Sequence, residues 1–394
     1  MHDRSFPRRF AASLVLMLSA SFFSPVLFAA PSTPTPTPTP AIVGYVFPQG
    51  AVLKPTDIDA TRLTRINYAF ANIAHGRIVP GFPTDAANFA TLTALRDQHP
   101  ALAILISVGG WTWSGAFSDM ALTHTRRAVF IESVADLLTR YSLDGLDIDW
   151  EYPGQPGAGH RFRPQDKQNY TLLLAELRHR LTLLRQQNHH PRPYLLTIAA
   201  GASDDFLEHT QMAQVAHLVD TVNLMAYDYY EPTDDRTTGH HAPLFTNPLD
   251  PKQVSADASV RAFEQAGVPA SRILLGLPFY GHIWSHVPDR NHGLFQPGSS
   301  IPDAYAPYGV IASTMLDHGF TRYWDPTASA PYLYNADKQL FVSYDDPESL
   351  TLKCTYVLRH RLGGVMFWDY SSDPTGTLLR TLDTALHPPT NPSH

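Results

Sequence analysis

The sequence predicts an α/β fold of the (β/α)8 barrel type, and three observations support this. Apolar, strand-like segments alternate with helical segments along most of the chain, as in parallel α/β folds. Eight such strand segments lie between residues 42 and 370. The alternative, an open doubly wound sheet, would place a Gly-rich phosphate turn after its first strand, whereas Gly44 stands alone there.

The strands expected from these patterns follow the chain at fairly regular intervals. They occupy residues 42–46, 65–73, 101–108, 143–152, 194–201, 221–230, 273–280 and 363–370. The helices expected around them occupy residues 89–97, 126–141, 168–187, 256–265, 347–361 and 376–386. The helix over 126–141 is amphipathic, and its apolar side is expected to hold Val129, Val134, Leu137, Leu138 and Tyr141.

The alternation of strands and helices breaks between residues 281 and 344. Gly, Pro and aromatic residues surround short strand-like pieces there. We therefore predict a small α+β insertion domain over 282–344, between strand 7 and helix 7. The barrel then comprises residues 41–281 and 345–386, and residues 387–394 form a tail.

The N-terminal segment has the pattern of a secretory signal peptide. Arg4, Arg8 and Arg9 precede an apolar run that reaches Phe28, and small residues follow it, which predicts a signal peptide over 1–30. The Arg pair leaves Sec and twin-arginine export both open. Residues 31–40, PSTPTPTPTP, predict an extended linker. No later segment approaches 18 apolar residues, so we expect a secreted (extracellular or periplasmic) monomer without membrane attachment.

Composition excludes several classes of function. The net charge is −7 and only 16% of residues are charged, so nothing resembles the basic footprint of a nucleic-acid-binding protein. The single cysteine, Cys354, rules out an intrachain disulfide and a cysteine-based zinc site. His189-His190 and His240-His241 are adjacent pairs, whose side chains rarely converge on one ion. We therefore expect no metal site, and the family resemblance described below implies no cofactor.

The segment 143–152 combines an acidic face with an apolar face. Successive side chains of a strand point to opposite sides, so residues two apart share a face at roughly 6.5 Å spacing. One face carries Asp147, Asp149 and Glu151. Leu146 and Trp150 belong to the opposite face, with Ile148 between them. A solvated acidic strand is the alternative, but the strongly apolar opposite face favours a buried acidic row with a chemical role.

The same segment resembles a known family signature. Asp144-Gly145-x-Asp147-x-Asp149-x-Glu151 resembles the DGxDxDxE motif of family 18 glycoside hydrolases, the chitinase-like (β/α)8 barrels. Segments on three other expected strands agree with it, and the insert resembles the chitinase insertion domain. These segments are 107–111 (SVGGW), 225–228 (MAYD) and 364–368 (GVMFW). The resemblance covers residues 41–386.

The resemblance implies a retaining mechanism assisted by the substrate's own 2-acetamido group. Glu151 would be the general acid at the strand tip. Asp149 would hydrogen-bond the acetamido N–H and stabilise the cation, while Asp147 would hold the proton needed as Asp149 turns. Tyr227 would donate its hydroxyl to the acetamido oxygen.

The resemblance also implies a set of substrate-binding residues, with Trp368 stacked under the sugar in the cleavage subsite. The predicted set is Tyr45, Phe70, Gly110, Trp111, Met225, Asp228, Tyr280 and Trp368. Trp113, Trp284 and Trp324 are further candidates for stacking on a polymer. Many family members carry a Trp after the Tyr-Asp pair, whereas this chain has Tyr229-Tyr230-Glu231-Pro232, so the product-side contacts stay open.

The function implied is a secreted chitinase that hydrolyses β-1,4 bonds between N-acetylglucosamine units of chitin or its oligomers. An endo-β-N-acetylglucosaminidase acting on glycans or peptidoglycan is the first alternative, although such relatives generally lack this insert. A chitin-binding lectin on the same barrel is the second, although such relatives usually lose the acid corresponding to Glu151. Endo or exo action and preferred chain length stay open.

Overall fold

A computed structural model describes residues 39–302 and 304–388 of the chain. The expected signal peptide (1–30), residues 31–38 of the linker and residues 389–394 of the tail lie outside the described residues. The structural statements below refer to the described ranges.

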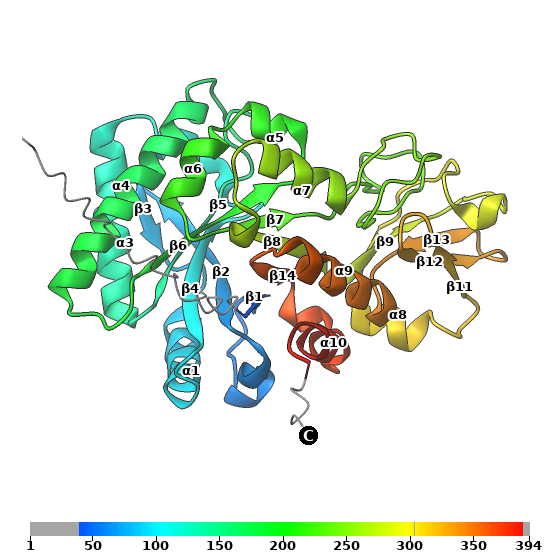
Figure 1. Cartoon of the computed structure of the whole chain (residues 1–394), viewed down its shortest axis with the longest axis horizontal. Helices are drawn as coiled ribbons and strands as arrows, with labels where there is room; N and C mark the ends of the chain where they lie inside the picture. Colours follow the sequence, from blue (N-terminus) through cyan, green and yellow to red (C-terminus); the bar gives the residue numbers. More distant parts are fainter. Residues whose placement is uncertain (1–38, 303, 389–394) are drawn as a thin grey trace, which may run out of the picture. The chain divides into compact units, whose positions relative to one another are not determined.

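Parallel strands close into a barrel, which confirms the predicted fold class (Figure 1). The strands are β1 (Ala41–Val46), β2 (Arg65–Ala74), β4 (Ala103–Gly109), β5 (Gly145–Asp149), β6 (Leu195–Gly201), β7 (Thr221–Met225), β8 (Ile273–Pro278) and β14 (Gly364–Trp368). Their order around the barrel is β1-β14-β8-β7-β6-β5-β4-β2, and pairing of β1 with β2 closes the ring. A short strand, β3 (Arg77–Val79), pairs antiparallel with the end of β2.

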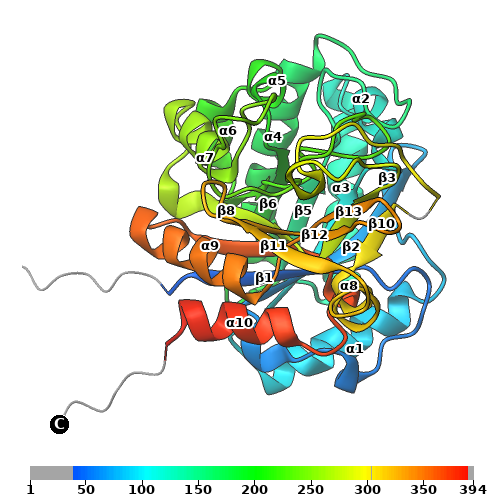
Figure 2. The same ribbon diagram turned by 90° about the vertical axis from the view of Figure 1, so that its right-hand side faces the viewer.

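Helices surround the barrel, and α9 and α10 lie side by side along β1 (Figure 2). The helices are α1 (Asp85–Gln98), α2 (Phe117–Met120), α3 (His124–Tyr141), α4 (Asp166–Gln187), α5 (Asp204–Glu208), α6 (Met212–Leu218), α7 (Ala256–Gln265), α9 (Pro347–His360) and α10 (Thr377–Leu386). Cys354 is fully buried in α9. No helix among residues 39–302 and 304–388 is long and apolar enough to cross a membrane.

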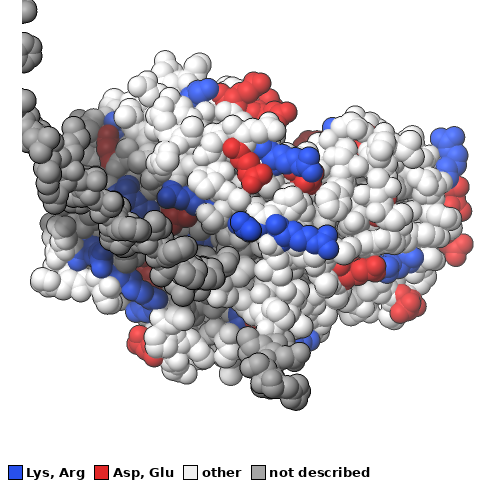
Figure 3. All heavy atoms as spheres, in the orientation of Figure 1, with Lys and Arg blue, Asp and Glu red and all other residues white. Residues whose placement is uncertain are grey.

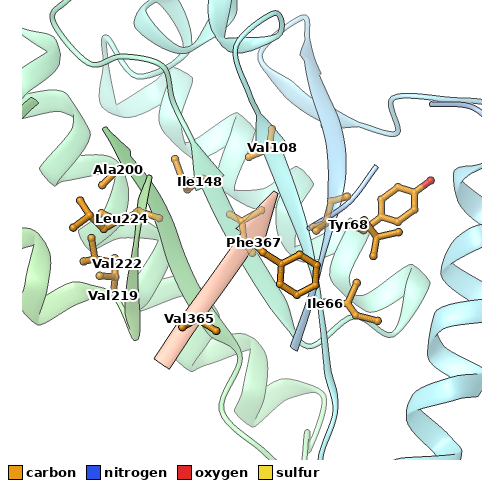
Figure 4. Packing of buried hydrophobic residues seen from close by; sticks show 14 of the residues in the cluster. Ile66, Tyr68, Val108, Ile148, Ala200, Val219, Val222, Leu224, Val365 and Phe367 are labelled. Carbon is orange, nitrogen blue, oxygen red and sulfur yellow. The ribbon is translucent and has the colours of Figure 1, made fainter. Parts of the chain in front are cut away.

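Strand alternation separates an apolar layer from a polar barrel interior. Ile66, Val108, Ile148 and Phe367 are fully buried in the main hydrophobic cluster, between the barrel wall and the helices (Figure 4). Ile148 has Asp147 and Asp149 as its neighbours on β5, so these two carboxyls point to the other side, into the barrel. The amphipathic pattern of 143–152 therefore separates core packing from a buried acidic row.

Four expected strands end earlier in the structure than the sequence predicts, and one of them is the strand expected over 363–370, which ends at Trp368. The acidic strand ends at Asp149, and the strand expected over 221–230 ends at Met225. The segment expected over 273–280 ends at Pro278, and Tyr280 begins a different strand. Apolar and aromatic residues continue past these ends, but they line a cleft or a second core instead of extending the barrel wall.

The apolar side of α3 differs from the prediction at one position. Val129 is 41% exposed, whereas Phe130 is fully buried. Residues four apart share a helix face, so Phe130 lies above Val134, and Leu137 and Leu138 follow on the same side. Placing Val129 on that side was wrong by about one residue, or roughly 100° of helix rotation.

A second, antiparallel sheet follows β8 directly. Its strands, in order, are β10 (Tyr305–Pro307), β9 (Tyr280–Trp284), β13 (Leu340–Ser343), β12 (Ala330–Asn335) and β11 (Thr321–Asp325), and α8 (Tyr308–Thr314) accompanies them. This α+β insertion lies at the right of Figure 1, and β9 begins at Tyr280, two residues before the expected boundary. Trp284 and Phe341 are fully buried in its own aromatic core.

The long loop 226–255 connects β7 to α7 and packs against the insertion. Tyr230 from this loop is buried in the insertion's aromatic core. The Lys353 ammonium of α9 donates to Asp345 and to the Ala242 carbonyl oxygen at 2.7 Å, and both Lys353 and Asp345 are buried. Barrel, loop and insertion are thus joined around the mouth of the barrel.

Charged side chains are spread over the surface. On the face drawn in Figure 3, Lys and Arg are interspersed with Asp and Glu among mostly uncharged residues. This agrees with the low charged fraction of the sequence, 16%.

Candidate active site

A cleft of about 550 Å³ opens at the carboxyl ends of the barrel strands, where (β/α)8 enzymes carry their active sites. Ten of the twelve predicted site residues line it. They are Tyr45, Phe70, Trp111, Asp149, Glu151, Met225, Tyr227, Asp228, Tyr280 and Trp368. The other two, Asp147 and Gly110, lie outside its lining.

Asp147 lies beneath the cleft and is completely buried. Its Oδ2 accepts hydrogen bonds from the hydroxyls of Tyr45 and Ser107, both at 2.8 Å. Its Oδ1 accepts from the Thr197 hydroxyl and from Asn223 Nδ2, the latter at 3.0 Å. Four donors from four different strands fix the position of this carboxyl.

Asp149 is the last residue of β5 and faces the cleft from directly above Asp147 in the row. It is 4% exposed, and within the described chain its Oδ1 is buried without a hydrogen-bond partner. Burial, followed by the negative charges of Glu151 and Asp147, raises the pKa of Asp149 well above its usual range. In the free protein this environment favours a proton on Asp149.

Glu151 follows β5 by two residues, and hydrogen bonds hold the backbone at this point. Its N–H donates to Ser114 Oγ at 2.9 Å, and Ser114 Oγ in turn donates to the Asp149 carbonyl at 3.0 Å. Trp150 points away from the cleft and stacks on Phe117, with ring centroids 5.1 Å apart. This packing turns the neighbouring Glu151 toward the cleft.

Burial raises the pKa of Glu151 to about 7. The nearby charges of Asp228 and Glu231 act in the same direction, whereas Tyr152 and Asp149 act to lower it. A carboxyl with this pKa keeps its proton in mildly acidic solution and can give it up near neutrality, as a general acid requires.

Asp228 is a second carboxyl of the cleft, in a very different environment. It has the left-handed backbone conformation (φ 58°), which is uncommon for a residue with a side chain. Its Oδ1 accepts from the Tyr280 hydroxyl at 2.6 Å, from His282 Nε2 at 2.8 Å and from His241 Nδ1 at 3.5 Å. Although burial acts to raise the pKa of Asp228, these donors lower it below the usual range.

The two histidines and Asp228 also have ligand-type atoms within 4.8 Å of one another, a spacing that a metal ion could use. Burial lowers the pKa of His241 to about 4, so this ring is neutral near pH 7. A neutral imidazole carries one N–H, which can donate to Asp228. The hydrogen bonds account for the cluster without an ion.

Aromatic side chains form the floor and wall of the cleft. Trp368 stacks on Phe70, with centroids 5.5 Å apart and planes 20° apart, and contacts Phe47 at 5.5 Å. Tyr227 lies edge-on to Tyr280 at 6.1 Å. Burial, then the charges of Asp228, Asp149 and Glu151, raises the pKa of Tyr227, so its hydroxyl stays a hydrogen-bond donor.

Of the four tryptophans considered for polymer stacking outside the cleavage subsite, only Trp111 lines the cleft, and it is 52% exposed. Trp113 packs on Phe82 at 5.4 Å, Trp284 is fully buried in the insertion, and Trp324 lies beside Arg322. None of these three lines the cleft.

Gly110 shapes the site through its backbone. Its φ is 78°, and a Cβ atom there would lie 2.7 Å from the Phe70 ring. The glycine therefore allows Phe70 to approach and stack on Trp368.

The tyrosines after Asp228 separate in space. Tyr229 lines the cleft and its hydroxyl lies 2.7 Å from Ser259 Oγ, whereas Tyr230 points into the insertion core. Only Tyr229 can therefore contribute to the product side of the cleft.

Sequence reasoning missed several residues that line the cleft. They are Tyr152, Ala199, Gly201, Ala202, Ser203, Glu231, Asp234, Asp235, Lys252, His282, Tyr305 and Met366. Most come from loops without periodicity. Glu231 had a usable signal, since it follows the Tyr-Asp segment by three residues. Burial and the charge of Asp228 raise its pKa to about 7.

Two carboxyls with raised pKa values in an aromatic-lined cleft, at the strand ends of a (β/α)8 barrel, are an arrangement that suits a glycoside hydrolase. A family model described as "Glycosyl hydrolases family 18" matches residues 41–373. The chain therefore belongs to glycosyl hydrolase family 18, as its motifs predicted.

Known proteins agree with this assignment. Chitinase A1 of Niallia circulans is 36% identical over 95% of this chain, which spans 62% of that relative's length. A solved family 18 N-acetylglucosaminidase from Paenibacillus barengoltzii is 40% identical, with a TM-score of 0.80 over 88% of this chain and 99% of that one. A class V chitinase mutant from Nicotiana tobaccum, solved in complex with NAG4, is 28% identical, with a TM-score of 0.80 over 88% and 99%.

Proposed function

We propose that this protein is a secreted chitinase that hydrolyses β-1,4 bonds between N-acetylglucosamine units. The observation that carries the proposal is the acidic row, in which Glu151 has a pKa of about 7 and Asp149 presents a buried, unpartnered Oδ1 to the cleft. An acetamido N–H would give that oxygen the partner that it lacks among the described residues.

The proposed mechanism is retaining and assisted by the substrate. Glu151 protonates the glycosidic oxygen as the bond to the leaving sugar breaks. The 2-acetamido oxygen attacks the anomeric carbon from the opposite side and forms an oxazolinium ion, with Asp149 accepting the acetamido N–H. Glu151, now a carboxylate, takes a proton from the water that opens this ion, so the product keeps the β configuration.

Other groups of the cleft support this chemistry. Tyr227 donates its hydroxyl to the acetamido oxygen and holds it in line with the anomeric carbon. Trp368, fixed by Phe70 and Phe47, supplies a flat apolar surface under the sugar ring. Asp228 is already held by three donors, which makes it a poor nucleophile.

Removal of single N-acetylglucosamine units is a second candidate function. The Paenibacillus barengoltzii enzyme, 40% identical over 88% of this chain, is described as an N-acetylglucosaminidase. The product side here carries Tyr229 and Glu231 from the loop after Asp228, in place of the Trp common in chitinases. Both candidates use the same acidic row and differ in the length of the product.

The test is hydrolysis of defined N-acetylglucosamine oligomers, with product length and anomeric form followed over time. We expect β-anomeric products, and dimers would favour chitinase action over removal of monomers. Glu151→Gln should lose nearly all activity, whereas Glu132→Gln, on the exposed face of α3, should keep it. Efficient cleavage of cellulose oligomers, which lack the acetamido group, would contradict the mechanism.

Export is part of the proposal and rests on the pattern of residues 1–30. Expression of the full chain in a bacterial host should give an exported protein that has lost this segment. N-terminal sequencing of the exported and retained fractions checks it, and an intact N-terminus in the cytoplasm alone would argue against export.

A further inference from the structure

The barrel interior holds a buried cation that the proposed mechanism does not use. Arg65 of β2 is 5% exposed. Its guanidinium donates to Thr221 Oγ1 at 3.1 Å and to Asn223 Oδ1 at 2.9 Å, both on β7. These acceptors are neutral, although a buried charge is costly without a partner of opposite charge.

Asn223 connects Arg65 to the acidic row. Its Nδ2 donates to Asp147 Oδ1 and to the Tyr45 hydroxyl, both at 3.0 Å. Because a guanidinium can only donate, it fixes the amide oxygen of Asn223 toward Arg65 and the amide nitrogen toward Asp147. Arg65 therefore determines which end of this amide meets the carboxyl.

The groups around the pair show how charge is balanced. Asp147 accepts hydrogen bonds from Tyr45, Ser107, Thr197 and Asn223 on other strands, and its charge acts on Asp149 of its own strand and on Tyr170 of α4. Arg65 donates to Thr221 and Asn223, and the charges of Asp147, Tyr45 and Asp220 act on it. Burial lowers the pKa of Arg65 and these three groups oppose that effect. A guanidinium nevertheless keeps its charge in proteins.

We propose that Arg65 is a positioning residue for the acidic row. It orients the amide of Asn223 toward Asp147, and it supplies a buried positive charge near the acidic row, which makes ionisation of Asp149 easier. The inference rests on the proposed function, because the acidic row has this role only in glycosidic cleavage.

The test compares pH profiles of kcat/KM for Arg65→Gln, Arg65→Lys and Arg127→Gln. Arg127 is a matched control, since it is also 5% exposed but pairs with Glu176 between α3 and α4, outside the barrel interior. Without the cation, the carboxyls ionise less readily. The acid limb of Arg65→Gln should therefore move up by about one pH unit, a tenfold change in the ionisation constant. KM should change little, while kcat at low pH falls.

Arg65→Lys keeps the positive charge, so the acid limb of its pH profile should lie close to that of the wild type. Arg127→Gln should lower the melting temperature and leave the profile in place. If Arg65→Gln does not fold, Asn223→Leu removes the connecting amide, keeps a similar volume and should move the same limb in the same direction.

The role of Arg65 would be overturned if the wild-type chain is active and the acid limbs of Arg65→Gln and Asn223→Leu both stay where the wild-type limb lies. An equal shift in Arg127→Gln would also overturn it. A wild-type chain that cleaves no N-acetylglucosamine oligomer would instead contradict the proposed function, so the two failures are distinguishable.

Discussion

At the scale of single residues, environment gives three similar carboxyls different properties. Asp147 receives four hydrogen bonds, Asp149 has an unpartnered oxygen, and Glu151 lies past the strand end against other negative charges. Because the acidic residues lie two positions apart along one strand, the sequence predicted the acidic row and its direction. It could not predict these differences, because the donors to Asp147 come from β1, β4, β6 and β7, far apart in the chain.

The pKa of Glu151 predicts the alkaline limit of activity. The general acid must be protonated, so kcat/KM should fall as the pH rises through about 7. Asp228→Asn removes a negative charge that raises this pKa, so its alkaline limb should lie at lower pH. A pH profile with a short oligomer checks both expectations, and an unmoved limb in Asp228→Asn would contradict the charge argument.

Ionisation of the Glu151 carboxyl should lower the stability of the folded chain at alkaline pH. Its pKa is about 7 in the folded chain, against 4.5 for the exposed group, so the native state binds more protons between these values. Stability therefore falls as the pH rises through this window, by a few kcal/mol in total. Glu151→Gln cannot ionise, so its melting temperature should exceed that of the wild type at pH 8 and match it near pH 4. Equal differences at both pH values would contradict this.

At the scale of elements, the periodicity of the sequence predicted the strands and long helices of the barrel but not its loops. The strands and long helices follow spacings of two and about 3.6 residues, which the sequence shows directly. Loop 226–255 and β9 have no such pattern, yet they carry Tyr229, Glu231, Tyr280 and His282 to the cleft. Tyr280 was predicted from a family resemblance, and His282 was missed, because its approach to Asp228 depends on how the insertion packs.

The contact of α9 with loop 226–255 should depend on Lys353. Lys353→Met would leave Asp345 buried without its counter-charge, which typically costs about 3–5 kcal/mol. Urea unfolding measures the change. As a control, Arg180→Met breaks an ion pair with Glu132, which is 58% exposed, and should cost no more than about 1 kcal/mol. If Lys353→Met and Arg180→Met lowered the free energy of unfolding by similar amounts, burial of the ion pair would not be what makes it important.

At the scale of the whole molecule, barrel and insertion should unfold together. Tyr230 of the barrel loop is buried in the insertion core, and Asp228 is held by Tyr280 and His282 of β9. Sequence analysis predicted the insertion only as a small added domain over 282–344. The structure shows that it also supplies hydrogen bonds to a carboxyl of the barrel, a relation that only the three-dimensional arrangement reveals.

Trp284→Ala tests this coupling. Loss of the buried Trp284 ring leaves a cavity in the insertion core, which should lower the free energy of unfolding by about 3–5 kcal/mol. The melting temperature of the entire chain should fall, in one transition. Activity should fall as well, because β9 also carries Tyr280 and His282. Circular dichroism and tryptophan fluorescence should give coincident curves. Val129→Ala, at an exposed position, should change stability by less than about 0.5 kcal/mol. Two separate transitions would show independent units.

The place where β9 begins has a consequence for building chimaeras from related enzymes. An exchange that cuts the chain between Pro278 and Tyr280, where the barrel sheet ends and the second sheet begins, would remove two of the three donors to Asp228 along with the insertion. A graft made after Trp284 would keep them with the recipient barrel. Exchanges of the insertion should therefore begin after β9, one strand later than the division into domains would place them.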